Sequence, residues 1–382
     1  MLLALSLALL TPPQSAQAIP AFARKYRMSC TTCHAPFPKL KAYGDEFAGD
    51  GFVLKDQDAP RYYVETGDEN LDLIRDLQAA FRLEGFVKHE TKTDQDVDFT
   101  APYNLKFLSG GALSDHLAYY FYFFFSERGE VAGIEDAFVM FNDVFNTELD
   151  IYLGQYQVSD PLFKRELRLT YQDYQVYRMT PGDSRVNLTY DRGVMMTWGF
   201  ANGPGFVFQI LNGNGIGEAN EFRVYDDDKY KNFALHASQD VGEFVNVGLF
   251  GYYGKEAESG YKNEMWMLGP NGTIGNDKIE LNGQYMLRRD DNPWFTATKP
   301  SDEIETQGGL AEVVYMPDGD RSTWYLTGLY NWVDSDDDLE DYEAVTAHVG
   351  WVLRTNFRLI AENTYDIEQE ENQFVVGFIS AF

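Results

Sequence analysis

An alternation of apolar and polar residues runs through most of this chain and constrains its fold more than any other feature. From about residue 71 onward, strand-like stretches of about 10–14 residues change residue type with a period of two. The stretch Lys278–Arg288 presents two sets of alternate positions: Ile279, Leu281, Gly283, Tyr285 and Leu287 against Glu280, Asn282, Gln284, Met286 and Arg288. Residues 345–351 repeat the pattern. Because a helical bundle requires a period of 3.6, the pattern predicts an all-β fold.

The connections between these stretches also alternate, between short turns and longer acidic loops. The short turns fall near residues 203–205, 240–242, 317–319 and 354–356. The longer loops fall at residues 88–98, 213–229, 288–305, 334–343 and 366–371. Short turns on one side and long loops on the other are typical of outer-membrane barrels, which in bacteria have an even number of antiparallel strands. We therefore predict an outer-membrane antiparallel β-barrel of about 16 strands over residues 71–382, in contact with outer-membrane lipid.

Two further segments support a membrane barrel. Leu117–Phe125 (LAYYFYFFF) is nine residues long, about the length of one membrane crossing by a strand. The C-terminal residues alternate and end on an aromatic residue, through Phe374, Val376, Phe378, Ser380 and Phe382. This ending resembles the terminal strand of outer-membrane proteins, with Ser380 as a departure.

The N-terminus predicts export. Met1–Leu10 is a continuous apolar run, and the small residues around Ala16 and Ala18 form a cleavage signature. We expect residues 1–18 to be a signal peptide that is removed before Ile19. No later run reaches the ~20 apolar residues of a membrane helix, so the exported protein is expected to be either soluble or a barrel.

The only two cysteines predict a cofactor. Cys30 and Cys33 stand in the order C-x-x-C-H with His34, which is the pattern of c-type haem attachment. Two thiols one helical turn apart can each bond a haem vinyl group, and the adjacent imidazole of His34 can ligate the iron. The alternatives are a lone disulfide, which lacks the βαβ pattern of redox-active pairs, and a zinc site, which lacks further ligands. We expect one covalent c-type haem.

The haem segment, residues 19–70, is small for a domain that must cover a haem by itself. Residues 35–70 contain neither His nor Met, so the remainder of the protein is expected to cover the haem. His236 and His348 fall on the lumen-facing phase of their predicted strands and are candidates for the distal iron ligand. The alternative is that both are ordinary pore-lining histidines.

The longest connection, residues 157–191, separates the fifth and sixth predicted strands. General porins fold the loop at this position into the barrel. By analogy we expect the connection to narrow the lumen or to pack on the haem. The alternative is an ordinary exposed loop.

The charge balance restricts the partners. The chain has 60 acidic and 31 basic residues, for a net charge of -29, which argues against nucleic acid and favours cations. Residues 334–343 and 366–371 contain carboxylates but no Lys or Arg. They form either a cation-gathering entrance or simply a solvated edge.

The N-terminal residues also carry a family resemblance. Ile19-Pro-Ala-Phe-Ala-Arg24, the motif Cys30-Thr-Thr-Cys33-His34 and Phe37-Pro-Lys-Leu40 resemble the fused monohaem cytochrome c–porins of the bacterial outer membrane. The best-known members oxidise iron. The specific match covers roughly residues 19–52, and over the barrel the likeness is architectural only. The resemblance implies that Cys30, Cys33 and His34 bind the haem.

The resemblance also implies a function. In the iron-oxidising members an electron passes from extracellular Fe(II), through the haem, to periplasmic carriers such as a cytochrome. The iron substrate does not carry over with the shared residues, because related cytochrome–porins of other substrates would share them. We expect an outer-membrane electron conduit, with Fe(II) as the favoured donor and the haem segment on the periplasmic side or inside the barrel. One alternative is a diffusion porin with a structural or sensing haem plug, and another is a soluble periplasmic electron carrier.

Overall fold

The structure is a computed structural model that describes residues 21–54, 64, 66–71, 73–92, 97–200, 203–300 and 303–382. The predicted signal peptide, residues 1–18, and the first residues of the family resemblance lie outside the described residues. Within the described residues, three short helices precede the barrel: α2 (Ala21–Tyr26), α3 (Cys30–Cys33) and α4 (Ala42–Gly49). None of the helices in the described ranges is long and apolar enough to cross a membrane.

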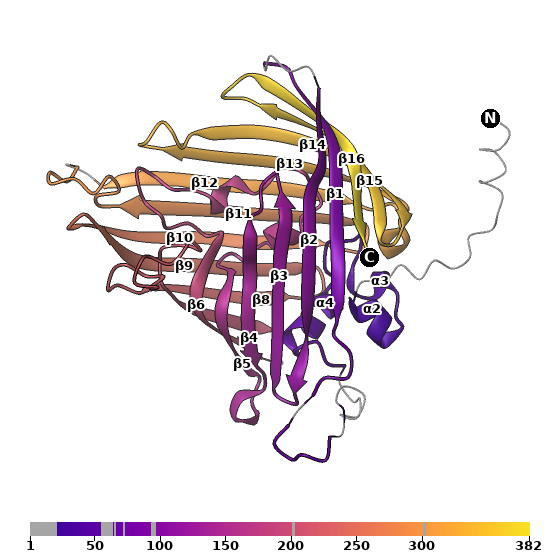
Figure 1. The fold of residues 1–382 in the computed structure, drawn as a ribbon. Coiled ribbons are helices and arrows are strands. Elements are labelled where there is room, and N and C mark those ends of the chain that lie inside the picture. The colour runs from indigo at the N-terminus through magenta and orange to yellow at the C-terminus, as the bar shows by residue number, and fades with distance from the viewer. Residues whose placement is uncertain are drawn as a thin grey trace.

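Sixteen antiparallel strands form a closed barrel, in which each strand pairs with its neighbours in sequence and the last pairs with the first (Figure 1). The strands are β1 (Ala79–Glu90), β2 (Asp98–Ser114), β3 (Leu117–Glu127), β4 (Gly133–Phe141), β5 (Leu149–Gln157), β6 (Tyr190–Gly199), β7 (Pro204–Leu211), β8 (Asn232–Val241), β9 (Val245–Glu258), β10 (Tyr261–Gly275), β11 (Ile279–Asp290), β12 (Ile304–Tyr315), β13 (Trp324–Ser335), β14 (Tyr342–Arg354), β15 (Phe357–Asp366) and β16 (Glu371–Ala381). The predicted all-β barrel is confirmed.

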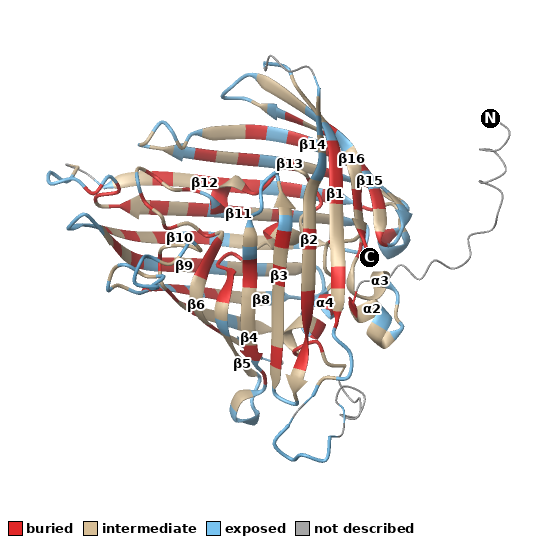
Figure 2. Cartoon of the chain, in the orientation of Figure 1, coloured by how far each residue is buried: buried red, intermediate tan, exposed pale blue. Residues whose placement is uncertain are grey.

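The alternation of residue types follows the two faces of the barrel wall. Along β11 the side chain of Leu281 is 49% exposed, whereas Met286 and Arg288 are fully buried. The same alternation of buried and more exposed residues runs along the strands in Figure 2. Apolar residues therefore face outward in a band, and the residues between them point into the lumen, as the period of two predicts.

The two ends of the barrel differ in their connections. Most turns that follow an even-numbered strand, such as residues 242–244 after β8 and 355–356 after β14, are short. These turns share one end of the barrel with the N-terminal helices and the C-terminus (Figure 1), and we call it the short-turn end. Most of the longer loops, such as residues 212–231 and 336–341, lie at the opposite, long-loop end.

The connection between β5 and β6 lies inside the barrel. Residues 158–189, which we call the inward loop, contain two 3-10 turns, η3 (Arg165–Leu167) and η4 (Gln175–Tyr177). The hydroxyl of Tyr174 donates to Glu312 of β12 over 3.0 Å, and Asn331 of β13 donates to the backbone oxygen of the loop's Asp173 over 2.8 Å. Because these partners lie on wall strands far from β5, the loop crosses the lumen. This confirms the prediction that it narrows the barrel.

Apolar packing and one buried arginine hold the inward loop in place. Val176, Tyr177 and Leu188 of the loop are almost fully buried against lumen-facing residues of the wall, which include methionines of β10 and β11. Arg288 of β11 donates to the backbone oxygens of Met179 and Val186, over 2.7 and 2.6 Å. The loop therefore fills the middle of the lumen with apolar side chains, in contrast to the polar interior of an open porin channel.

Candidate functional site

The two cysteines lie on one turn of helix at the short-turn end. Ser29 caps α3, with its hydroxyl accepting a hydrogen bond from the backbone nitrogen of Thr31 over 3.3 Å. The helix ends at Cys33, and the backbone nitrogen of His34 donates to the backbone oxygen of Cys30 over 2.9 Å. Both cysteines are partly exposed free thiols, so neither is engaged in the alternative disulfide. This single turn brings the thiols and the imidazole together.

The His34 ring is oriented by a backbone carbonyl. Its Nδ1 lies 2.8 Å from the oxygen of Pro38. Since a carbonyl oxygen only accepts hydrogen bonds, Nδ1 carries the proton and Nε2 keeps the lone pair that a metal ligand requires. Burial lowers the pKa of the imidazole, although the contacts with backbone carbonyls oppose this effect. The neutral, ligating form of His34 is therefore favoured.

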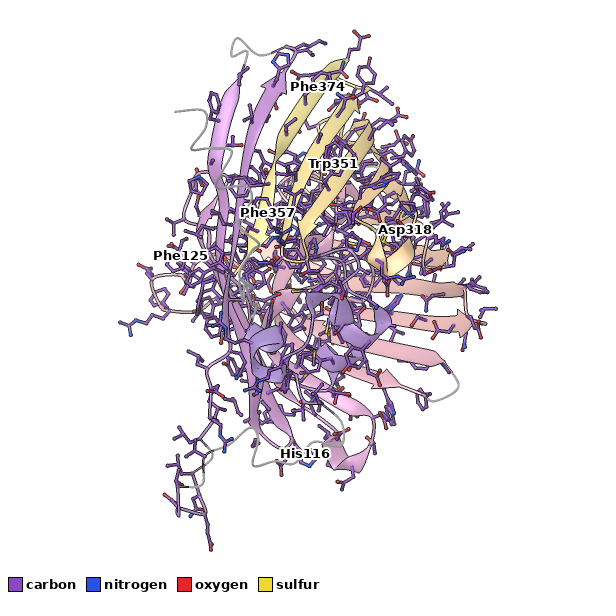
Figure 3. The ribbon with its side chains drawn as sticks, turned by 90° about the vertical axis from the view of Figure 1, so that its right-hand side faces the viewer. His116, Phe125, Asp318, Trp351, Phe357 and Phe374 are labelled. Carbon is purple, nitrogen blue, oxygen red and sulfur yellow. The ribbon has the colours of Figure 1, made fainter. Side chains whose placement is uncertain are left out.

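The motif opens into an internal cavity of about 430 Å³. Cys30, Cys33 and His34 line one part of it, and the inner faces of β1 to β7 and the start of the inward loop line the remainder. Figure 3, turned by 90° from Figure 1, shows the three N-terminal helices at the barrel mouth. A volume of this size is within the range of ligand and cofactor sites. The barrel wall thus lies next to the motif, and that it covers a haem stays a prediction.

The lining of the cavity is apolar in one part and charged in another. Phe22, Phe47 and Phe52 of the N-terminal segment pack together at ring-centroid distances of 4.8 to 6.0 Å. The charged part contains three cations and four carboxylates: Arg82, Lys106, Lys164, Asp45, Asp136, Asp160 and Glu166. The apolar part matches the flat apolar body of a macrocycle such as haem.

Buried polar atoms in the cavity wall provide a further test of fit. Among the described residues, Asp136 Oδ1 and Gln157 Oε1 are buried and make no hydrogen bond to the protein, and both residues line the cavity. Buried acceptors of this kind need a donor, because leaving them unpaired costs about 1–3 kcal/mol each. An ionised haem propionate carries no donor, so these two acceptors do not contribute to the fit. The C-x-x-C-H motif and the apolar part of the lining do, and by them the residues present fit a haem.

The structure does not bring the two predicted distal histidines to this cavity. His236 Nε2 lies 3.0 Å from the amide oxygen of Asn271. His348 Nδ1 lies 2.7 Å from Glu362, and its Nε2 lies 3.3 Å from the hydroxyl of Tyr325. Neither histidine is among the lining residues of the cavity. Both lie on the lumen side of the wall, as predicted, but in hydrogen bonds away from Cys30.

Two thioethers do line the cavity. Met28 precedes Cys30 by two residues, and Met195 comes from the inner face of β6. Met195 was not predicted as a site residue. Its lumen-facing phase, two residues before Thr197, was the available signal. A thioether is a common second axial ligand of cytochrome haems, so the wall places a suitable donor at the cavity.

A second, smaller cavity of about 40 Å³ lies on the long-loop side of the first and shares Arg82 and Glu166 with it. Its lining contains five guanidinium groups and five carboxylates: Arg82, Arg128, Arg165, Arg168, Arg358, Glu84, Glu127, Glu135, Glu166 and Asp173. Lys106 and Glu166 form an ion pair of 2.9 Å at the boundary. Across the described residues, no three His, Cys, Asp or Glu side chains are grouped as a metal-ion site.

Comparison with known proteins agrees with this architecture. No family model matches the sequence, and no curated protein sequence matches it. The anion-selective porin of Comamonas acidovorans superposes with a TM-score of 0.58 at 13% identity, over 80% of this chain and 99% of the porin. A loop-deletion mutant of the outer membrane protein OmpT of Vibrio cholerae gives 0.56 at 12% identity, over 80% and 99% of the chains. OmpF of Salmonella typhi, in complex with daunomycin, gives 0.55 at 13% identity, over 80% and 97%. At these identities the likeness shows a porin-like barrel fold.

Proposed function

We propose that this chain is an outer-membrane electron conduit with one covalent c-type haem. In this proposal an extracellular donor, Fe(II) by preference, reduces the haem, and the haem passes the electron to a periplasmic cytochrome. The observation that carries the proposal is that the C-x-x-C-H motif opens into a cavity inside the barrel. A haem in that position would lie between the short-turn end and the start of the inward loop.

The protein residues have separable roles at this site. Cys30 and Cys33 would bond the haem vinyl groups. His34 would bind the iron through Nε2, because its Nδ1 is engaged by the backbone oxygen of Pro38. The apolar part of the lining, with Phe22, Phe47 and Phe52, would surround the apolar body of the haem. The haem, when bound, supplies the one-electron chemistry, and the protein supplies its position and surroundings.

The two ends of the barrel determine the orientation that we propose for the chain in the membrane. Outer-membrane barrels place their short turns in the periplasm and their long loops outside the cell. On that basis the N-terminal helices face the periplasm, next to electron acceptors, and the acidic loops face the extracellular donor. The negative charge of the loops would raise the local concentration of a divalent cation.

A diffusion porin with a structural or sensing haem plug is the second candidate, because the solved structures of similar fold include porins. The packed interior argues against it as the main role. The inward loop fills the middle of the lumen, and the N-terminal helices lie across the short-turn end. A soluble carrier has no support in the barrel fold, whose outward residues form an apolar band.

One absorption spectrum of the purified protein, recorded before and after the addition of Fe(II), tests the proposal. We expect the spectrum of oxidised haem to change to that of reduced haem at neutral pH. A haem that dithionite reduces but excess Fe(II) does not would favour another donor. A protein without haem, in contrast, would leave the diffusion porin as the better reading.

A further inference from the structure

Three of the four carboxylates that line the large cavity have a cation beside them. Asp45 and Asp160 share the ammonium group of Lys164, whose Nζ lies 3.6 Å from the first and 3.8 Å from the second. Glu166 pairs with Lys106 over 2.9 Å. The negative charges of these three side chains are therefore balanced within the protein.

The fourth carboxylate, Asp136 of β4, is buried and has no such partner. It is 6% exposed, and among the described residues its Oδ1 makes no hydrogen bond and no cation lies at ion-pair distance from it. The adjacent Glu135, in contrast, accepts a hydrogen bond from the hydroxyl of Tyr122 over 3.0 Å. A buried carboxylate without a partner is costly when it is ionised, and this cost is removed when the group binds a proton. Asp136 is therefore the position at which the cavity can take up one proton.

The groups around Asp136 do not offset its negative charge. They contain four carboxylates, three cations and four phenols, which come from α4, β1 to β6 and the inward loop: Asp45, Glu135, Asp160, Glu166, Arg82, Lys106, Lys164, Tyr120, Tyr122, Tyr152 and Tyr190. Each of the three cations is paired to another carboxylate, in the case of Arg82 to Glu84. The charge of Asp136 thus responds to any further charge in the cavity.

We propose that Asp136 binds a proton when the haem is reduced and releases it when the haem is oxidised again. This inference rests on the proposed function. The electron from the donor converts Fe(III) to Fe(II) and removes one positive charge from the cavity. A proton from solvent, bound by the Asp136 carboxylate to form the carboxylic acid, restores that charge. Transfer of the electron to the periplasmic acceptor reverses both steps, so the net charge of a low-dielectric interior stays constant.

A redox titration of the purified haem protein in detergent, followed by haem absorption at a series of pH values, tests the coupling. When one proton accompanies one electron, the equilibrium constant changes tenfold per pH unit, which corresponds to about 59 mV. We expect the reduction potential of the wild type to fall with a slope that approaches this value over part of the pH range. Asp136→Asn should lose that slope. Because asparagine is neutral, the two potentials should converge at low pH, and the variant should have the higher potential at high pH.

Two control variants remove one carboxylate each. Glu135→Gln changes the adjacent, hydrogen-bonded side chain and should keep the slope. Asp115→Asn changes an exposed side chain in the turn between β2 and β3, where solvent screens the charge, and should leave the whole curve unchanged. Equal slopes for the wild type and Asp136→Asn would overturn the inference and assign the pH dependence to another group, such as a haem propionate. Loss of the slope in Glu135→Gln alone would also overturn it.

Infrared spectroscopy detects the proton without relying on the folding of a variant. The reduced-minus-oxidised difference spectrum of the wild type should contain the carbonyl stretch of a protonated carboxyl group, which shifts in D2O and is absent from Asp136→Asn. A wild-type spectrum without this band would overturn the inference.

The Cys30→Ala, Cys33→Ala protein separates the inference from the proposed function, because it cannot attach haem. A change of pH, in place of reduction, should produce the same carboxyl band in this protein, and the band should be lost when Asp136→Asn is added. A haem-free protein in which no such band titrates would overturn the role of Asp136. Failure of Fe(II) to reduce the haem, with the pH slope preserved when dithionite is the reductant, would overturn only the donor.

Discussion

At the scale of single residues, the proposed attachment of haem depends on the cysteine pair. Thioether bonds survive denaturation, whereas axial ligation does not, so the wild-type band should stain for haem peroxidase activity after denaturing electrophoresis. Cys30→Ala together with Cys33→Ala should abolish the stain, and the protein should still form its barrel because neither thiol contributes to the wall. A stained band from the double variant would show that the attachment assignment is wrong.

The distal side of the haem can be tested with adjacent residues. Met195 lines the cavity, whereas Met196, on the opposite phase of β6, does not. We predict that Met195→Leu changes the Soret and near-infrared bands of the haem, because leucine keeps the volume but lacks the sulfur. Met196→Leu is the matched control and should leave the spectrum unchanged. His236→Ala and His348→Ala should also leave it unchanged, and a spectral effect of either would restore that histidine as a ligand.

The sequence was informative about these residues to different degrees. Cys30, Cys33 and His34 are local in sequence, and one turn of helix suffices to bring them together, so their spacing predicts the site. Met195 reaches the cavity only through the closure of the barrel. Alternation places Met195 on the inner face, but its position along the barrel axis depends on the register of β6 with β5 and β7. Alternation likewise gave no axial position for His236 and His348, which lie away from the cavity.

At the scale of structural elements, Arg288 controls the inward loop. Its side chain is fully buried, pairs with Asp290 over 2.7 Å and donates to two backbone oxygens of the loop. Arg288→Leu leaves a buried carboxylate without its partner, so we predict a loss of about 3–5 kcal/mol of stability. Limited proteolysis should then cut within residues 158–189. The control Arg289→Leu removes an exposed pair with Glu305 and should cost at most about 1 kcal/mol.

Resistance of the inward loop to protease in the Arg288→Leu variant would show that apolar packing alone holds the loop.

The position of the inward loop was expected from its length and its place in the order of strands, by analogy with porins. Its path could not be derived, because the contacts that fix it join Met179 and Val186 to a strand more than 100 residues away. The strands themselves were predictable, since alternation is a local signal.

At the scale of the whole molecule, the closed barrel predicts behaviour in detergent. Since all sixteen strands are paired on both sides, no free edge exists at which unfolding can begin. The protein should fractionate with outer membranes and migrate faster on gels when it is not heated than when it is boiled. A freely soluble protein with unshifted mobility would contradict the membrane assignment and leave the haem assignment unaffected.

The acidic residues around the turn between β13 and β14 have two roles: some bind the inward loop, and others carry exposed negative charge. Asp337 accepts from the backbone nitrogen of Gly182 over 2.8 Å, and Glu340 accepts from that of Thr180 over 2.8 Å, so two of its carboxylates hold the inward loop. Asp334, Asp336 and Asp338 are exposed. The exposed carboxylates are therefore the ones to change when the effect of charge on Fe(II) is measured.

We predict that Asp334→Asn, Asp336→Asn and Asp338→Asn together lower the second-order rate of haem reduction by Fe(II) at low salt and flatten its dependence on salt. Asparagine keeps the side-chain oxygen that accepts from Gln307 and from the backbone of Glu305, so the loop should stay folded. Screening over ~8–10 Å removes most of the attraction at ordinary ionic strength, and wild-type and variant rates should converge there. Stopped-flow absorbance measures both rates, and a reductant that is neutral at the same pH, such as hydroquinone, serves as a control without cation attraction. Equal rates for Fe(II) at low salt would mean that these carboxylates only solvate the rim, and that the donor reaches the haem without help from the charge of this loop.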